Sequence, residues 1–199
     1  MPLTRKGAAT RQRIVEGAAA EMRRTGIFSL TLDDVMQRTA TSKSQLFHYF
    51  PDGKDQLLLA VARYEASRVI SDQQPELGAL HSWPAWLEWR DKVVDRYRKQ
   101  GSTCPVNAVM GQLGATTEGA RAVVTELYAQ WQGELAAGIR SMQSQGEIAA
   151  ELDAERGARA LLAGIQGGVL IHITTGSLEH LEAVLDQGIE SLRRSAAKA

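Results

Sequence analysis

The sequence predicts an all-α protein of about nine helices. Apolar residues recur at helical spacing over long stretches, alternating β-branched residues are few, and the 199 residues include only five prolines. No low-complexity segment or internal repeat interrupts this pattern. Hydrophobic residues make up 44% of the chain and charged residues 23%, which is typical of a soluble globular protein. No apolar run approaches the roughly 20 residues that a membrane span needs, so we expect no membrane partner.

The first predicted helix runs from about Ala9 to Thr25. Its apolar residues Ile14, Ala18 and Met22 recur every four positions and therefore share one face. Gly26 follows the helix and is a natural stop, because glycine adopts the backbone conformation that ends helices.

Two shorter helices are predicted next. Thr31 is an N-cap candidate, and Asp33 and Asp34 follow in the first turn, where the helix dipole favours carboxylates. This helix should end near Thr39. A third helix, capped by Ser42, should cover residues 43–50, because a proline and a glycine follow closely.

The rest of the chain also shows helical spacing. Residues 73–84 are expected to form a loop, and Asp153 and Ser177 are N-cap candidates for a final helical hairpin linked at Gly176. The remaining predicted helices are 55–71, 86–100, 107–115, 118–145, 153–175 and 177–195. We expect two domains, residues 1–54 and residues 55–199.

The second and third helices match a helix-turn-helix in length and order, since three or four residues join them directly after a longer helix. At about 100° per residue, three apolar side chains of the third helix should face inward: Leu46, Phe47 and Phe50. The polar side chains should point outward: Ser44, Gln45 and His48, with Tyr49 at the margin. Such a face suits base edges and phosphates.

Charge is distributed unevenly along the chain. The net charge is +0, but residues 1–54 contain nine Lys or Arg against five Asp or Glu and therefore carry +4. A polyanionic partner for this part would explain the imbalance. Chance segregation of solvated charges would give the same imbalance.

The segment TLDDVMQRTATSKSQLFHYFPDGKDQL resembles the signature of the TetR family, in which S-K-x-x-L-(Y/F)-x-Y-F is followed by a lysine. The resemblance covers residues 10–58, and the extra residue in PDGK and the later Cys104-Pro105 favour the LmrA/YxaF-like branch. It implies a homodimeric, cytoplasmic transcription factor that binds double-stranded operator DNA. By family default it is a repressor, released by a small-molecule effector.

The resemblance also implies a set of DNA-binding residues. Thr31 and Tyr49 would contact phosphates, and Lys54 would hold the backbone at the start of the fourth helix. The residues along the major groove, with the cap that precedes them, would be Ser42, Lys43, Ser44, Gln45 and His48.

Three residues depart from the family pattern in this motif. Ala40 stands where the family usually has a turn glycine, and a left-handed alanine there would cost roughly 1 kcal/mol. Thr41 replaces an apolar residue and Met36 a small one. These changes suggest a repacked turn.

In the final hairpin, Ala160, Gly164 and Gly168 fall four residues apart, which permits a close approach between helices. Packing within one chain is one interpretation. The resemblance implies instead a four-helix dimer interface, for which the predicted residues are Ala160, Gly164, Gly168, Leu181, Leu185 and Ile189, and the apolar stripe also includes Leu161, Leu170, Val184 and Leu192.

The resemblance further implies a ligand cavity in the second domain. Candidates to line it are Trp83, Trp86, Trp89, Cys104, Met110, Tyr128, Trp131 and His172. Aromatic and methionine residues at helical spacing are also common in ordinary cores. An apolar or aromatic effector is expected.

Enzymatic activity is not expected. The four histidines are scattered, and the chain contains no H-E-x-x-H, P-loop or G-x-S-x-G motif, so no cofactor or metal is expected either. The lone Cys104 excludes an internal disulfide and favours a reducing cytoplasm, and the first residues lack the apolar stretch of a secretory signal. Two alternatives stay open: a thiol-based sensor acting through Cys104 and a helical protein-interaction module.

Overall fold

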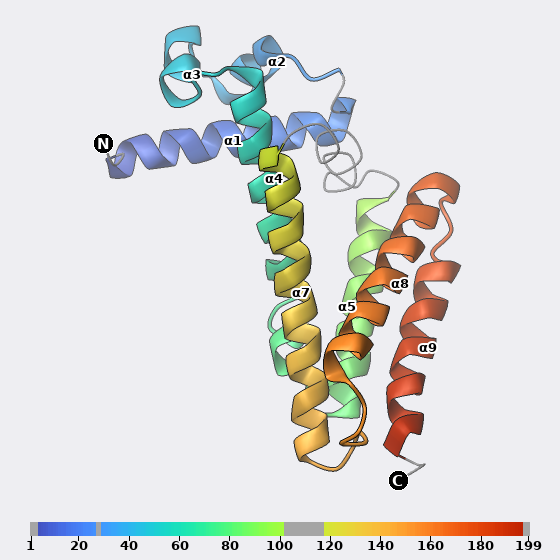
Figure 1. Cartoon of the computed structure of the whole chain (residues 1–199). Coiled ribbons are helices and arrows are strands. Elements are labelled where there is room, and N and C mark those ends of the chain that lie inside the picture. The colour runs from blue at the N-terminus through green and yellow to red at the C-terminus, as the bar shows by residue number, and fades with distance from the viewer. Residues whose placement is uncertain (1–3, 27–28, 102–117, 197–199) are drawn as a thin grey trace. The chain divides into compact units, whose positions relative to one another are not determined.

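The computed structural model describes residues 4–26, 29–101 and 118–196, and within them every regular element is a helix (Figure 1). The all-α prediction is confirmed. The predicted short helix at 107–115 lies outside the described residues. The described elements are α1 (Arg5–Thr25), α2 (Leu32–Thr39), α3 (Lys43–Tyr49), α4 (Lys54–Ser71), the 3-10 helix η1 (Glu76–Ala79), α5 (Trp83–Gln100), α7 (Glu118–Ser144), α8 (Ala154–Thr175) and α9 (Glu179–Ala196).

The chain forms two compact units. The described part of the first comprises residues 4–26, 29–68 and 118–124, and that of the second comprises residues 69–101 and 125–196. Most of α4 thus groups with α1–α3, whereas the predicted division into domains 1–54 and 55–199 stays a prediction. Within the described residues, no helix combines the length and the apolar character that a membrane crossing requires.

Helix α1 organises the first unit. It begins at Arg5, four residues earlier than predicted, because the Thr4 hydroxyl accepts a hydrogen bond from the backbone N–H of Gly7 at 3.2 Å. The predicted face of Ile14, Ala18 and Met22 is buried. Helix α2 packs on α1, and the two helices come close at one point.

That close approach lies at Gly17. A Cβ atom added there would lie 2.1 Å from Cγ2 of Thr39, the last residue of α2. A side chain at position 17 would therefore require the Thr39 side chain or its helix to shift.

Helix α5 begins at Trp83, three residues before the predicted start. The Ser82 hydroxyl accepts from the N–H of Ala85 at 3.3 Å, and Pro84 in the first turn suits a helix start because its φ is already fixed. The preceding segment was predicted as a loop, but it includes η1 at Glu76–Ala79.

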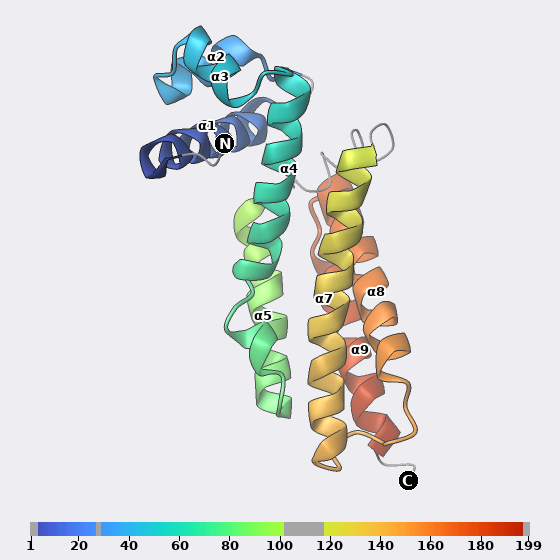
Figure 2. The same ribbon diagram turned by 60° about the vertical axis from the view of Figure 1, so that its left-hand side comes forward.

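Helices α8 and α9 form the predicted hairpin and lie side by side (Figures 1 and 2). Gly176 closes it in the left-handed conformation, with φ of 79°. Helix α7 buries the apolar stripe that its sequence predicts: Val123, Leu127, Trp131, Leu135 and Ile139.

The glycines of α8 serve this hairpin within one chain. A Cβ atom at Gly164 would lie 2.3 Å from Val184 Cγ2, and one at Gly168 would lie 2.7 Å from Leu181 Cα. Leu181, Leu185 and Ile189 are also buried. The set of residues predicted for the dimer interface stays a prediction. Ala160 is its exposed member.

Candidate DNA-binding surface

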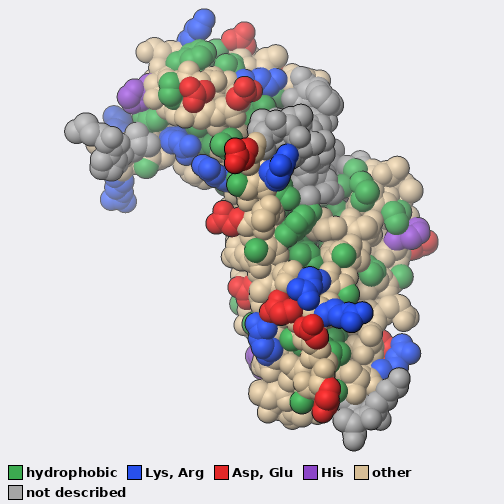
Figure 3. Space-filling model, viewed as in Figure 1, with side chains coloured by type: hydrophobic (Ala, Val, Ile, Leu, Met, Phe, Trp, Pro, Cys, Tyr) green, Lys and Arg blue, Asp and Glu red, His purple; other side chains and the backbone are tan. Residues whose placement is uncertain are grey.

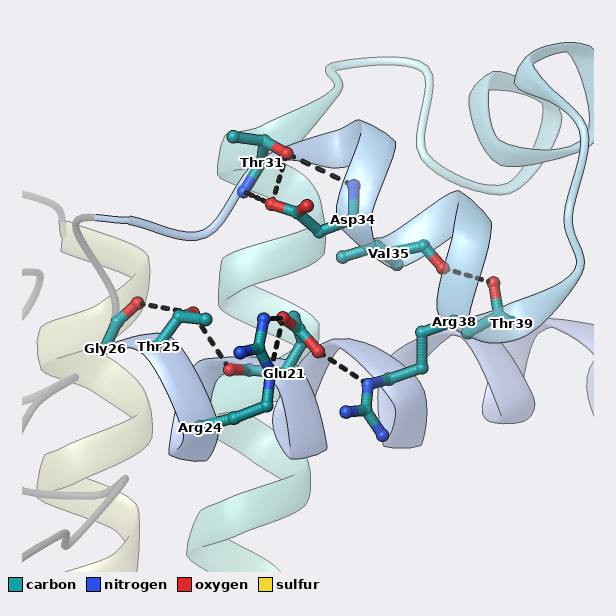
Figure 4. A network of polar contacts seen from close by, with 9 residues as sticks. All are labelled: Glu21, Arg24, Thr25, Gly26, Thr31, Asp34, Val35, Arg38 and Thr39. Atoms are coloured by element: carbon teal, nitrogen blue, oxygen red, sulfur yellow. Dashed lines mark hydrogen bonds and ion pairs between the residues drawn. The ribbon is translucent and has the colours of Figure 1, made fainter.

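Reciprocal hydrogen bonds cap both short helices of the helix-turn-helix. The Thr31 hydroxyl accepts from the N–H of Asp34, whose carboxylate accepts from the N–H of Thr31, each at 3.2 Å (Figure 4). Ser42 and Gln45 make the same pair at 3.2 and 3.3 Å. The predicted N-caps are confirmed. Helices this short are marginal alone, so their ends depend on such caps.

The turn between α2 and α3 is left-handed at Ala40, with φ 47° and ψ 46°. The Thr39 hydroxyl donates to the carbonyl of Val35 at 2.7 Å and lies 2.8 Å from the buried Thr41 hydroxyl. Arg13 of α1 donates to the carbonyl of Thr39. The sequence departures at positions 40 and 41 are therefore accommodated, because the polar Thr41 finds its partner inside the turn.

Helix α3 presents polar side chains to solvent. Ser44, Gln45 and His48 are exposed as predicted, and Lys43 is exposed as well. Leu46 and Phe50 are buried as predicted, but the prediction for Phe47 is wrong, since its side chain is 39% exposed. The two buried residues lie about 40° apart around the helix, whereas Phe47 lies about 100° from Leu46, on the flank. The exposed aromatic ring thus borders the polar face.

The side chains of Tyr49 and Arg11 lie at the C-terminal end of α3. Tyr49 is half-buried, and its ring meets that of His48 edge to face with centroids 4.8 Å apart. The guanidinium of Arg11 lies 5.0 Å from the centroid of the Phe50 ring, which sets a cation of α1 beside the end of α3. Lys and Arg side chains lie along α1 on the face shown in Figure 3.

Lys54 binds the protein's own backbone. Its ammonium donates to the carbonyl of Leu30, the residue just before the α2 cap Thr31. It therefore ties the start of α4 to the start of α2, and its charge stays partly exposed.

A buried carboxylate joins α1 to α2 (Figure 4). Glu21 accepts hydrogen bonds from Arg24 Nε at 3.0 Å and from Arg38 Nε at 2.7 Å. The bonds from Arg24 and then Arg38 hold the pKa of this carboxyl below its ordinary value, against the opposing effect of burial. Sequence reasoning missed this cluster. Its one local signal is the i, i+3 spacing of Glu21 and Arg24.

The candidate ligand-binding residues of the second unit are mostly interior. Trp86, Trp89, Trp131 and His172 are buried, and Trp86 meets Trp89 edge to face with centroids 5.7 Å apart. The Tyr128 hydroxyl is 3.2 Å from Oε1 of Gln166. Cys104 and Met110 lie outside the described residues.

Comparison with known proteins identifies the family. Residues 14–61 match the N-terminal domain described as bacterial regulatory proteins of the tetR family. Residues 84–187, more than half of the chain, match the C-terminal domain described as tetracyclin repressor-like. The chain belongs to the TetR family. This confirms the resemblance, and assignment to the LmrA/YxaF-like branch stays a prediction.

Relatives of this TetR-family chain are described as transcriptional regulators. An uncharacterized HTH-type regulator of Mycobacterium tuberculosis is 29% identical over 110 residues, which cover 52% of the chain and 53% of that protein. The chain thus spans about half the length of this relative. An uncharacterized HTH-type regulator of Lactococcus lactis is 25% identical over 185 residues, covering 89% of the chain and 90% of its own length.

Solved structures share the TetR fold. A TetR-family regulator of Cytophaga hutchinsonii has a TM-score of 0.76 at 23% identity and covers 100% of this chain and 98% of its own. The reduced form of Escherichia coli NemR has a TM-score of 0.79 at 14% identity, covering 94% and 99%. The relatives are regulators rather than enzymes, in agreement with the sequence prediction.

Proposed function

We propose that this chain is a homodimeric repressor that binds operator DNA through α3 and releases it when a small molecule binds the second unit. The observation that carries the proposal is the exposed polar face of α3, held by two capping boxes above the buried Leu46 and Phe50. A short, rigid helix with such a face suits the major groove.

The proposed contacts follow from this exposure. Lys43, Ser44 and His48 are free to meet base edges and phosphates. Gln45 uses its side-chain oxygen to cap α3, so its amide N–H₂ is the group that would donate to DNA. Ser42 would act through this cap. Thr31 and Tyr49 are proposed to contact phosphates.

Lys54 is proposed to act on DNA indirectly. Because its ammonium is bound to the carbonyl of Leu30, it would fix the position of the neighbouring Thr31. Its partly exposed charge would add attraction to the phosphates.

The proposed dimer interface is an exposed stripe on α8. Ala160, Ala163, Gly167 and Leu170 follow one another at three- or four-residue spacing, and the Leu170 side chain is 61% exposed. Small residues permit close helix approach, and Leu170 supplies apolar area to bury. Two copies related by a two-fold axis would read half-sites roughly 34 Å apart or a multiple of that.

Release from DNA is proposed as a shift in population. The effector would bind the arrangement of the two DNA-binding units that does not fit the operator more tightly than the arrangement that does. Nearly complete switching requires a preference of about 10⁴-fold.

The test is fluorescence-anisotropy titration of the full chain against duplexes that it enriches from a random pool, with a scrambled duplex for comparison. We expect Lys43→Ala and Tyr49→Ala to weaken binding. Lys43→Ala should also reduce the slope of log affinity against log salt by about 1, because one phosphate contact is lost.

Lys99→Ala is the matched control, since Lys99 is an exposed lysine of α5, and its binding should equal that of the wild type. Failure to enrich any duplex would overturn the proposal and favour the protein-interaction module.

A further inference from the structure

The interior of the second unit holds polar groups without hydrogen-bond partners. Nε1 of Trp86, Nε1 of Trp131 and both ring nitrogens of His172 are buried and form no hydrogen bond with any of the described residues. The other two tryptophans differ. Trp83 Nε1 donates to Glu147 Oε2, and Trp89 Nε1 donates to Gln73 Oε1, each at 2.9 Å.

Such groups are rare in folded proteins. A buried polar group left unsatisfied destabilises the folded protein, and the large majority of such groups find a protein or water partner. An indole N–H can only donate, and a neutral imidazole has one donor nitrogen. The described interior of the second unit thus offers at least three donors, and none of the described residues supplies an acceptor for them.

These donors come from three helices that pack together. Trp86 of α5 packs on α7 at Gly138, where an added Cβ atom would lie 3.2 Å from its ring. Trp131 precedes Gly138 by seven residues, so it occupies the same face of α7 about 10 Å along the axis. His172 belongs to the buried face of α8, which is linked to α7 by the contact between Tyr128 and Gln166.

Arg96 is a separate case. Its Nη1 also has no hydrogen-bond partner among the described residues, but its Nε binds Asp72 at 3.3 Å, and the residue lines an outer groove of about 460 Å³ with charged neighbours. The interior set of unpartnered groups therefore consists of Trp86, Trp131 and His172.

We propose that the effector carries carbonyl or carboxylate oxygens on an apolar or aromatic body, and that Trp86, Trp131 and His172 donate hydrogen bonds to them. This inference rests on the proposed ligand response and refines the expectation of an apolar or aromatic effector. A hydrocarbon would leave the donors unsatisfied, and a group that only donates, such as an ammonium, would not pair with an indole N–H. Sites built to hydrogen-bond a ligand reject analogues that lack the bonding group.

The experiment uses the indole ¹H–¹⁵N resonances of the full wild-type chain, which has four tryptophans. Single Trp→Phe variants assign them. Benzoate and acetophenone are the probes, and toluene and ethylbenzene are their hydrocarbon counterparts. We expect an acceptor-bearing probe to shift the Trp86 and Trp131 resonances downfield, with smaller changes at Trp83 and Trp89, whose N–H groups are already bonded.

Affinities from the same titrations give the second readout. An acceptor-bearing probe should bind at least about tenfold more tightly than its hydrocarbon counterpart, because it satisfies a buried donor. Trp131→Phe should lose most of this preference, whereas Trp83→Phe should retain it. Equal binding of both kinds of probe, or no shift of Trp86 and Trp131 with either acceptor, overturns the inference.

The outcome is independent of the DNA-binding proposal. Anisotropy with operator DNA is measured on the same samples. If the indole resonances shift but DNA is not bound, the result contradicts the proposed DNA-binding function and leaves the proposed effector class standing. If DNA is bound normally but the indole resonances do not shift, the result contradicts the proposed effector class and leaves the DNA-binding proposal standing.

Discussion

Ala40 occupies the left-handed region between α2 and α3, where a Cβ atom costs free energy and glycine does not. We expect Ala40→Gly to raise the free energy of unfolding by about 1 kcal/mol, measured by urea denaturation. The matched control is Ala137→Gly at an exposed position within α7, which should lower it by about 1 kcal/mol. A loss of stability in both variants would contradict the prediction.

Glu21 makes the stability of the protein depend on pH. Because its folded-state pKa lies below the ordinary value of about 4.3, its contribution is fully present above that value. It is lost as pH falls through the lowered folded-state pKa, since the unfolded chain takes up a proton first. The Glu21→Gln variant should therefore be less stable than the wild type at pH 7. This difference in stability should become smaller as pH falls below about 4.3.

Thermal unfolding from pH 7 to pH 3 measures this gap. Glu151→Gln replaces an exposed carboxylate and should follow the wild type throughout. A gap for Glu21→Gln that stays constant with pH would mean that packing, rather than charge, holds α1 to α2.

At the scale of elements, the α8–α9 hairpin depends on Gly168. A Cβ atom there would lie 2.7 Å from the Leu181 backbone, which cannot rotate away as a flexible side chain can. We expect Gly168→Ala to lower the free energy of unfolding by about 1–3 kcal/mol through overpacking. Gly133→Ala is the control, because Gly133 of α7 has open space around it and should gain about 1 kcal/mol of helix propensity.

Chemical denaturation of both variants provides the measurement. An equal rise in the free energy of unfolding of both variants would show that α9 can shift away from position 168 at little cost. The packing of Gly168 against Leu181 would then contribute little to the hairpin.

At the scale of the whole molecule, the prediction concerns the dimer. Leu170→Glu places a charge in the proposed α8 interface, where it would be desolvated without a partner. We expect sedimentation velocity to show a shift from dimer to monomer, with weaker operator binding. Leu87→Glu is the control, since Leu87 is an exposed apolar residue of α5 outside the stripe. A Leu170→Glu variant that stays dimeric would place the interface elsewhere.

The local signals of the sequence determined the helices. Thr31, Ser42 and Asp153 cap the helices predicted from them, because capping depends on residues only three positions apart. The buried stripe of α7 and the family motif were also readable, since each is a pattern within one segment. Helix starts at Arg5 and Trp83 were predicted too late, because the caps Thr4 and Ser82 are single residues without a strong neighbouring pattern.

Tertiary structure alone decided which partner each face meets. The period of 3.6 residues marks the face of α8 that carries Gly164 and Gly168, but it does not tell whether α9 or a second copy covers that face. The ion pair between Glu21 and Arg38 joins residues 17 positions apart in the sequence. The unpartnered groups of Trp86, Trp131 and His172 come from three separate helices. Periodicity and caps are local properties of the chain, whereas these contacts exist only once helices distant in sequence have packed together.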